Sequence, residues 1–206
     1  QNPAHAEALL LLSENVRDVE DLKALEAALQ KFPDRNLVRF HLATANFLRA
    51  RADRNGAAAA VQRALQVDAK SPLAHAALAA LQAEAGAADR ALASHKAAVA
   101  NAPLRSKHHI DLASFLIQAG ATAEALNLLQ DMVRQTPDYL PVWRSLALLA
   151  ALNRKGQEAD ALLQRALAVE PTDYQTLLQR AGLWLAAGEL ERGIAELERL
   201  RREYPG

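Results

Sequence analysis

Residues 140–171 read LPVWRSLALLAALNRKGQEADALLQRALAVEP, and this stretch recurs in altered form on both sides of itself. Equal steps back along the chain from Trp143 reach His109, His75 and His41. Four prolines keep the same spacing: Pro103, Pro137, Pro171 and Pro205. A fixed period of roughly 34 residues indicates repeated supersecondary units, each of which buries its apolar face only against its neighbours. We therefore expect each copy to form one helical hairpin.

Small residues recur at fixed places in this period. If Trp143 is numbered position 4 of its unit, alanine recurs at positions 8 and 20 of most units. Position 8 holds Ala45, Ala79, Ala113, Ala147 and Ala181, and position 20 holds Ala57, Ala91, Ala125 and Ala159. Small side chains let neighbouring helices approach closely, so we expect both columns to lie between packed helices.

The pattern resembles the tetratricopeptide repeat, a helix–turn–helix unit of about 34 residues with a Trp, Leu, Gly, Tyr, Ala, Phe and Pro pattern. The residues that match are Trp143, Leu146, Ala147, Ala159, Leu163, Ala166 and Pro171. The resemblance implies an all-α fold, an α-solenoid that forms a right-handed superhelix of about six hairpins. The predicted units are 2–35, 36–71, 72–105, 106–139, 140–173 and 174–206, which form a single array over residues 1–206. Because the chain begins at Gln1 without a methionine, we expect it to be a fragment of a longer protein.

Turns within the units show two exceptions to a common pattern. Glycine at position 15, as in Gly86 and Gly120, is expected to end the first helix in a left-handed conformation. The DRNG tetrapeptide at 53–56 is predicted to stop a helix over 35–52. In the fifth unit Arg154 stands at position 15 and Gly156 follows two residues later, which predicts a slightly different turn.

Composition excludes several classes of function. The 24 basic and 24 acidic residues balance, so no overall field draws the chain to nucleic acid. No apolar run approaches the roughly 20 residues of a membrane-spanning helix, so we expect no membrane insertion of this segment. The absence of cysteine excludes disulfides and is compatible with either the bacterial cytoplasm or the periplasm.

Catalytic and metal-binding patterns are also missing from the sequence. There is no phosphate-binding GxxxxGK loop, no GxSxG elbow and no HExxH motif. Four histidines share position 4, but adjacent hairpins lie roughly 10 Å apart, too far for a shared metal ion. His95 falls in an apolar column, and acidic residues such as Asp160 are expected at helix ends or on outer faces. We predict no enzyme, no cofactor and no metal site.

The resemblance implies a concave groove lined by the first helix of each unit, where positions 2, 5, 9 and 12 contact a bound peptide. The predicted partner-binding residues are Arg39, Leu42, Asn46, Arg49, Lys107, Ile110, Ser114, Ile117, Arg144 and Leu148. The cations among them predict a basic rim with few carboxylates, which favours an extended ligand with some negative charge. The alternative is that these cations are ordinary solvated surface residues.

Two specialised members of the family can be tested by residue. A chaperone-binding carboxylate clamp requires Lys at position 5 and Arg at position 6 of particular units, where this chain has Leu42 and Asp111. An asparagine ladder at position 6 marks the glycosyltransferase type. That column reads Glu7, Ala43, Ala77, Asp111, Ser145 and Gln179, so neither specialisation is predicted.

The last unit departs from the pattern. Arg180 at position 7 and Gly193 at position 20 are expected to weaken its packing, as a terminal cap does. An apolar stripe of Ile194, Leu197 and Leu200 has no following helix to cover it. Either the protein continues beyond Gly206 or the stripe meets a partner, including a second copy of the chain.

Together these features predict a non-catalytic protein–protein interaction scaffold that binds a partner segment in the concave groove. Alanine-rich, cysteine-free arrays of this kind are similar to bacterial repeat proteins that organise secretion, envelope assembly or exopolysaccharide export. One alternative is an accessory or regulatory segment of a larger enzyme or export protein. Another is a self-association module that acts through the terminal helices.

Overall fold

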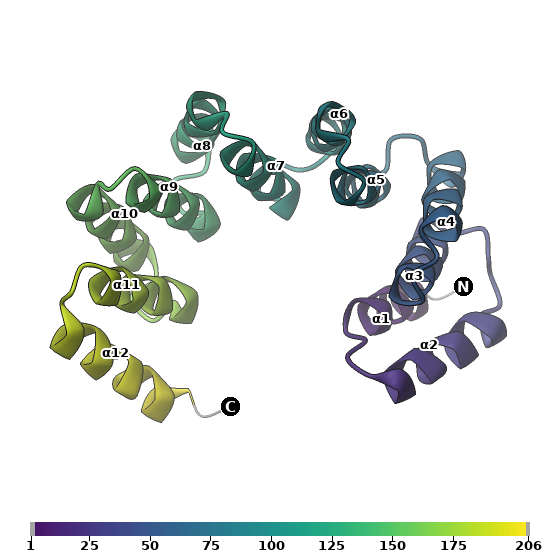
Figure 1. Cartoon of the computed structure of the whole chain (residues 1–206), viewed down its shortest axis with the longest axis horizontal. Helices are drawn as coiled ribbons and strands as arrows, with labels where there is room; N and C mark the ends of the chain where they lie inside the picture. The colour runs from purple at the N-terminus through teal and green to yellow at the C-terminus, as the bar shows by residue number, and fades with distance from the viewer. Residues whose placement is uncertain (1–2, 205–206) are drawn as a thin grey trace. The chain divides into compact units, whose positions relative to one another are not determined.

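The computed structural model of the chain describes residues 3–204. These residues form twelve α-helices and no strand, and consecutive helices pair as hairpins (Figure 1). The chain is therefore an all-α solenoid of helical hairpins, as the period predicts. It divides into two compact units, residues 1–103 and residues 104–206, which are described separately below. The right-handed superhelix and the single array over the whole chain stay predictions.

Unit 1 contains three hairpins. The first helices of successive hairpins contact each other, α1 with α3 and α3 with α5. The second helices α2 and α4 also contact the first helix of the next hairpin. The helices are α1 (Pro3–Glu14), α2 (Val19–Lys31), α3 (Val38–Ala50), α4 (Arg54–Val67), α5 (Pro72–Glu84) and α6 (Ala88–Ala100).

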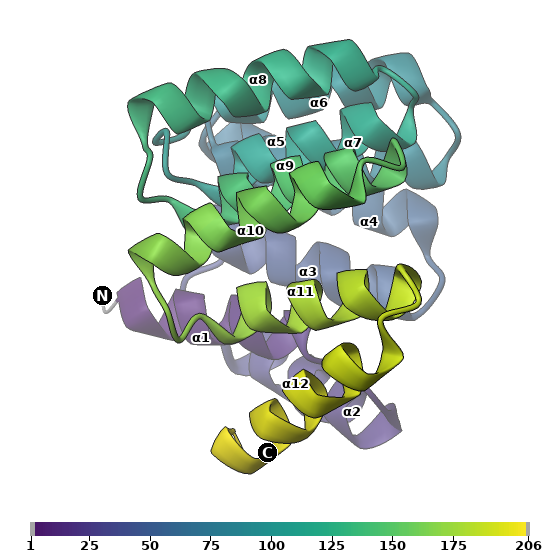
Figure 2. The ribbon, with the colours of Figure 1, turned by 90° about the vertical axis from the view of Figure 1, so that its left-hand side faces the viewer.

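Unit 2 repeats this arrangement, with α7 against α9 and α9 against α11. Figure 2 shows α9 between α8 and α10, which belong to adjacent hairpins. The helices are α7 (Lys107–Gln118), α8 (Thr122–Gln135), α9 (Leu140–Leu152), α10 (Gly156–Val169), α11 (Tyr174–Ala186) and α12 (Leu190–Glu203).

The small-residue columns lie inside both units, as predicted. Ala79, Ala113 and Ala181 at position 8 are fully buried, and so are Ala91 and Ala125 at position 20. Larger side chains such as Leu129 and Leu163 fill the neighbouring layer and are also buried. The core of each unit is therefore a series of thin layers between hairpins, as expected when each repeat packs only on its neighbours.

Position 15 adopts a left-handed backbone in every hairpin from the second onward. Glycine supplies this conformation at Gly86, Gly120 and Gly188 with φ of 72°, 77° and 82°. Two residues with a side chain do the same, Ala52 with φ 62° and Arg154 with φ 60°. The prediction of a different turn in the fifth unit was wrong, because Arg154 adopts the glycine conformation at the same position.

The DRNG segment also differs from its prediction. Helix α3 ends at Ala50, and α4 already begins at Arg54, so the tetrapeptide starts a helix and does not stop one. Asp53 is the N-cap, and its carboxylate accepts a 2.8 Å hydrogen bond from the Gly56 N–H. An aspartate at this position satisfies a backbone donor that has no partner within the helix. Ser71 caps α5 in the same way, because its hydroxyl accepts a hydrogen bond from the Ala74 N–H.

The last hairpin is packed more tightly than its sequence predicts. Arg180 on α11 pairs with Asp160 on α10 at 2.8 Å, and both side chains are about four-fifths buried. The Trp184 indole N–H donates to the same carboxylate at 3.2 Å. Asp160 is therefore an internal acceptor and not an outer-face residue. Gly193 lies so close to α11 that an added Cβ would stand 2.6 Å from Leu185, so the glycine permits close helix packing.

Candidate interaction groove

One open groove in unit 2 is lined mainly by side chains of the first helices α9 and α11. It has a volume of about 430 Å³. Three of the predicted partner-binding residues, Ile110, Arg144 and Leu148, lie in it. We call this site the α9–α11 groove, and its lining residues are Ile110, Pro141, Arg144, Ser145, Leu148, Gln175, Leu178 and Gln179.

Exposed leucines give the groove its apolar surface. Leu148 is 46% exposed and Leu178 is 37% exposed, although both are large aliphatic side chains. Leu178 was not predicted, yet it lies one repeat period after Arg144, at position 5 of the sixth unit. Gln175 follows Pro141 by the same period. Extending the predicted columns by one more unit would have found both residues.

Polar groups lie beside the leucines. The Ser145 hydroxyl donates to the Pro141 carbonyl at 2.9 Å, and the Gln179 amide donates to the Arg144 carbonyl at 3.0 Å. Gln175 is exposed, and a glutamine amide can donate and accept hydrogen bonds. The groove can therefore meet both the side chains and the backbone polar groups of an extended segment.

Arg144 stabilises the wall of this groove. Its guanidinium lies 2.6 Å from the carboxylate of Asp173, which caps the N-terminus of α11 and accepts from the Thr176 N–H at 2.8 Å. Burial raises the pKa of the Asp173 carboxyl, but hydrogen bonds from Thr176 and Arg144 outweigh it and hold that pKa below its usual value. The charge of Arg144 is thus neutralised within the fold.

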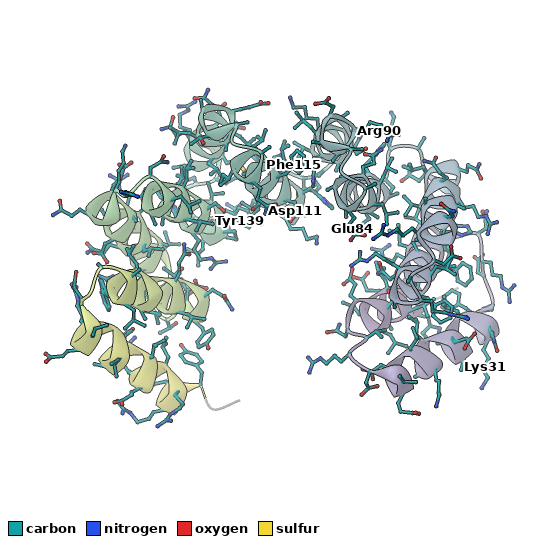
Figure 3. The ribbon with its side chains drawn as sticks, viewed as in Figure 1. Lys31, Glu84, Arg90, Asp111, Phe115 and Tyr139 are labelled. Carbon is teal, nitrogen blue, oxygen red and sulfur yellow. The ribbon has the colours of Figure 1, made fainter. Side chains whose placement is uncertain are left out.

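The other predicted cations are paired as well. In unit 1, Arg39 lies 3.1 Å from Glu7, and Arg49 lies 3.6 Å from Glu84 of α5, which is labelled in Figure 3. In unit 2, Lys107 lies 3.9 Å from Asp111 one turn along α7. The expectation of a basic rim with few carboxylates was wrong, because each of these cations has an acidic neighbour on its own helix or in an adjacent repeat.

The remaining predicted residues lie outside the α9–α11 groove. Leu42 is only 4% exposed and belongs to the core of unit 1, so it cannot contact a ligand without rearrangement. The Asn46 amide donates to the Ser13 hydroxyl of α1 at 2.9 Å. Ser114 and Ile117 are half-buried on α7 and do not line the groove. The structure therefore brings together only part of the predicted set.

Comparison with known proteins identifies the repeat. A family model described as tetratricopeptide repeat matches residues 82–152. This part of the chain therefore matches the tetratricopeptide repeat. A comparison with curated protein sequences finds no match.

Solved structures of tetratricopeptide repeat proteins resemble this chain along most of its length. A thermophilic TPR protein of Thermus thermophilus is 27% identical, with a TM-score of 0.63 over 82% of this chain and 92% of that one. A tetratricopeptide repeat protein from Parabacteroides merdae is 18% identical, with a TM-score of 0.68 over 98% and 81%. The Pseudomonas aeruginosa protein pilF is 17% identical, with a TM-score of 0.63 over 99% and 94%. The last two likenesses show the fold alone.

Position 4 of the repeat unit has a packing role in the third, fourth and fifth units. The Trp143 indole N–H donates to the Pro137 carbonyl at 2.7 Å, and a ring nitrogen of His75 lies 2.9 Å from the Ala69 carbonyl, which is also six residues back. Trp143 and His109 are each less than a tenth exposed. Within residues 3–204, no group of three or more potential ligands comes together to hold a metal ion.

The terminal stripe of the last repeat is smaller than predicted. Ile194 is 50% exposed and Leu197 is half-buried, but Leu200 is only 2% exposed because it packs in the hairpin core. Leu190, one turn before Ile194, is 57% exposed and was not predicted.

Among the described helices, none is both long and apolar enough to cross a membrane.

Proposed function

We propose that the chain is a non-catalytic protein-interaction scaffold, and that the α9–α11 groove of unit 2 binds an extended segment of a partner protein. The observation that carries this proposal is the exposure of Leu148 and Leu178 in one groove beside free polar capacity at Gln175. Exposed aliphatic side chains in a concave site gain free energy when a ligand covers them, and nearby polar groups orient that ligand.

Charge pairing determines the kind of segment that we expect. Because Arg144 is already neutralised by Asp173, an acidic ligand gains little from it and would compete with an internal ion pair. We infer that the preferred segment is aliphatic and carries little net charge. This replaces the negatively charged ligand that the sequence alone favoured.

The proposed setting is an assembly in bacterial secretion or the cell envelope. The structure of PilW, described as a type IV pilus biogenesis factor, supports such a setting by its similar fold, with 15% identity and a TM-score of 0.66. The alternatives remain an accessory segment of a larger enzyme or export protein and a self-association module through Ile194 and Leu197. The predicted binding positions Arg39, Asn46 and Arg49 of unit 1 and Lys107 of unit 2 stay predictions of contacts outside this groove.

A selection from phage-displayed random linear peptides tests the groove. We expect enriched peptides to carry aliphatic residues and little charge, and to bind Leu148→Glu and Leu178→Glu variants at least about tenfold more weakly, since losing a partly buried leucine contact costs about 1.4 kcal/mol. Leu152→Glu is the control, because Leu152 on α9 is 60% exposed but lies outside the groove. Enriched peptides that bind all three variants as well as the wild type would place the binding site elsewhere.

A further inference from the structure

A second groove in unit 2 lies between α8 and α10, on helices that the predicted peptide groove does not use. It has a volume of about 470 Å³ and shares no lining residue with the α9–α11 groove. Its floor is α9, and its walls include Leu126 of α8 and Leu162 of α10. We call it the α8–α10 groove.

The length of this groove suits a short helix. The floor runs along α9 from Trp143 through Leu146 and Leu149 to Asn153, while α8 and α10 flank it on either side. At a rise of about 1.5 Å per residue, this floor is about 15 Å long. A ligand helix of about three turns would match it.

The middle of the groove favours a helix over an extended segment. Leu126, Val133, Leu146, Leu149 and Leu162 line it, and their side chains offer no hydrogen-bonding group. An extended segment would bury backbone N–H and C=O groups against these side chains without partners. A helix satisfies its own backbone and presents only side chains to an apolar groove.

Charge at the Trp143 end of the groove adds a second requirement for the ligand. At the opposite end, near Asn153, Lys155 is paired with Glu158 at 3.1 Å, so those charges cancel. Near Trp143, Arg134 is paired with Asp131, whereas Arg165 lies over the indole with its guanidinium carbon 5.6 Å from the ring centroid. Among residues 3–204, no carboxylate lies within ion-pair distance of Arg165. One positive charge therefore remains for a ligand.

We propose that the α8–α10 groove binds an amphipathic helix of a partner protein. Apolar residues at helical spacing would face α9, and an acidic side chain at one end would face Arg165. This site is separate from the proposed peptide groove, so the chain would hold two partner segments of different conformation.

A phage-displayed library of helix-forming peptides tests the proposal. Each peptide spans about four helical turns, which covers the groove with a margin at its ends. Selection uses a Leu148→Glu/Leu178→Glu variant, in which the other groove is blocked. We expect enriched peptides to carry apolar residues at i, i+3 or i+4 and i+7, with an acidic residue near one end.

Variants of the groove then score the enriched peptides. Binding should weaken at least tenfold in Leu126→Glu and in Arg165→Glu, and replacing the peptide's acidic residue by lysine should restore binding to Arg165→Glu. Circular dichroism should show unchanged helicity, because Leu126 and Arg165 are exposed.

Three outcomes would overturn the proposal. The first is enrichment of peptides without helical spacing, and the second is equal binding to Leu126→Glu. The third is a concentration-dependent dimer in light scattering that Leu126→Glu converts to a monomer, which would make a second copy the occupant. None of these results bears on the α9–α11 groove, whose peptides come from a separate selection and are scored with Leu148→Glu and Leu178→Glu.

Discussion

The guanidinium of Arg144 lies 2.6 Å from the carboxylate of Asp173, with only about a fifth of each side chain exposed. The pair joins α9 to the N-cap of α11. These two helices are the first helices of successive repeats in unit 2. A cation that sequence alone assigns to ligand binding therefore stabilises the wall of the groove.

Replacing Arg144 by methionine should lower the free energy of unfolding by about 1–3 kcal/mol, because a partly buried carboxylate loses its charged partner. Urea denaturation at pH 7 measures this change. Arg39→Met is the matched control, since the Arg39–Glu7 pair is about half exposed and should contribute less than about 1 kcal/mol. An equal decrease in the free energy of unfolding in the two variants would show that the Arg144–Asp173 pair stabilises the fold no more than an exposed pair does.

Arg180→Met should destabilise unit 2 by about 1–3 kcal/mol, since Asp160 would keep its charge with fewer donors. A double variant that also carries Asp160→Ala should lose less than the sum of the two single changes, because no unpaired charge remains. Denaturation of all four proteins gives the coupling energy. Strict additivity would mean that the two residues act independently.

Acidification from pH 7.5 to pH 5.5 should destabilise the fold. Burial lowers the pKa of His41, His108 and His109. The positive charge of Arg63 lowers the pKa of His41 further. At His108, Asp111 partly offsets the effect of burial on the pKa, and Lys107 adds to it. Below about pH 6.5 the unfolded chain therefore binds more protons than the folded one, so stability falls until the folded pKa values are passed.

Urea denaturation at the two pH values measures this loss, and the His41→Gln/His108→Gln/His109→Gln variant is the comparison. We expect its free energy of unfolding to change less between pH 7.5 and 5.5 than that of the wild type. A variant with the same pH dependence as the wild type would assign the effect to other groups.

Arg154→Gly and Ala52→Gly should each stabilise the chain or leave it unchanged, by up to about 1 kcal/mol, because glycine adopts positive φ without steric cost. Gly120→Ala should destabilise by a similar amount. Its added Cβ meets nothing within 4 Å, so only backbone strain changes. Thermal unfolding of the three variants tests the sign. A gain in stability for Gly120→Ala would contradict the strain argument.

Most of the fold could be predicted because each repeat is a local unit with a fixed period. The alanine columns at positions 8 and 20 are buried as expected. The exceptions were turns, where Ala52 and Arg154 adopt a glycine conformation that neither residue type prefers.

The candidate site could be predicted only in part. The period placed Ile110, Arg144 and Leu148 in one groove, but it also placed Leu42 there, which the core of unit 1 buries. Periodicity predicts on which face of a helix a residue lies. It does not predict how much of that face a neighbouring helix covers. The α8–α10 groove had no signal of its own, because its floor residues Trp143, Leu146 and Leu149 occupy ordinary packing columns.

The sequence by itself determined the helical hairpins, their regular spacing and the small residues between them, since these depend on contacts within a repeat and with its nearest neighbour. The tertiary structure decided which charges are free. Arg144 meets Asp173 at the start of the next repeat's first helix, and Arg180 meets Asp160 of the preceding hairpin, while Arg165 meets an indole and no carboxylate among residues 3–204. These pairings depend on side-chain reach between packed helices, which no period in the sequence encodes.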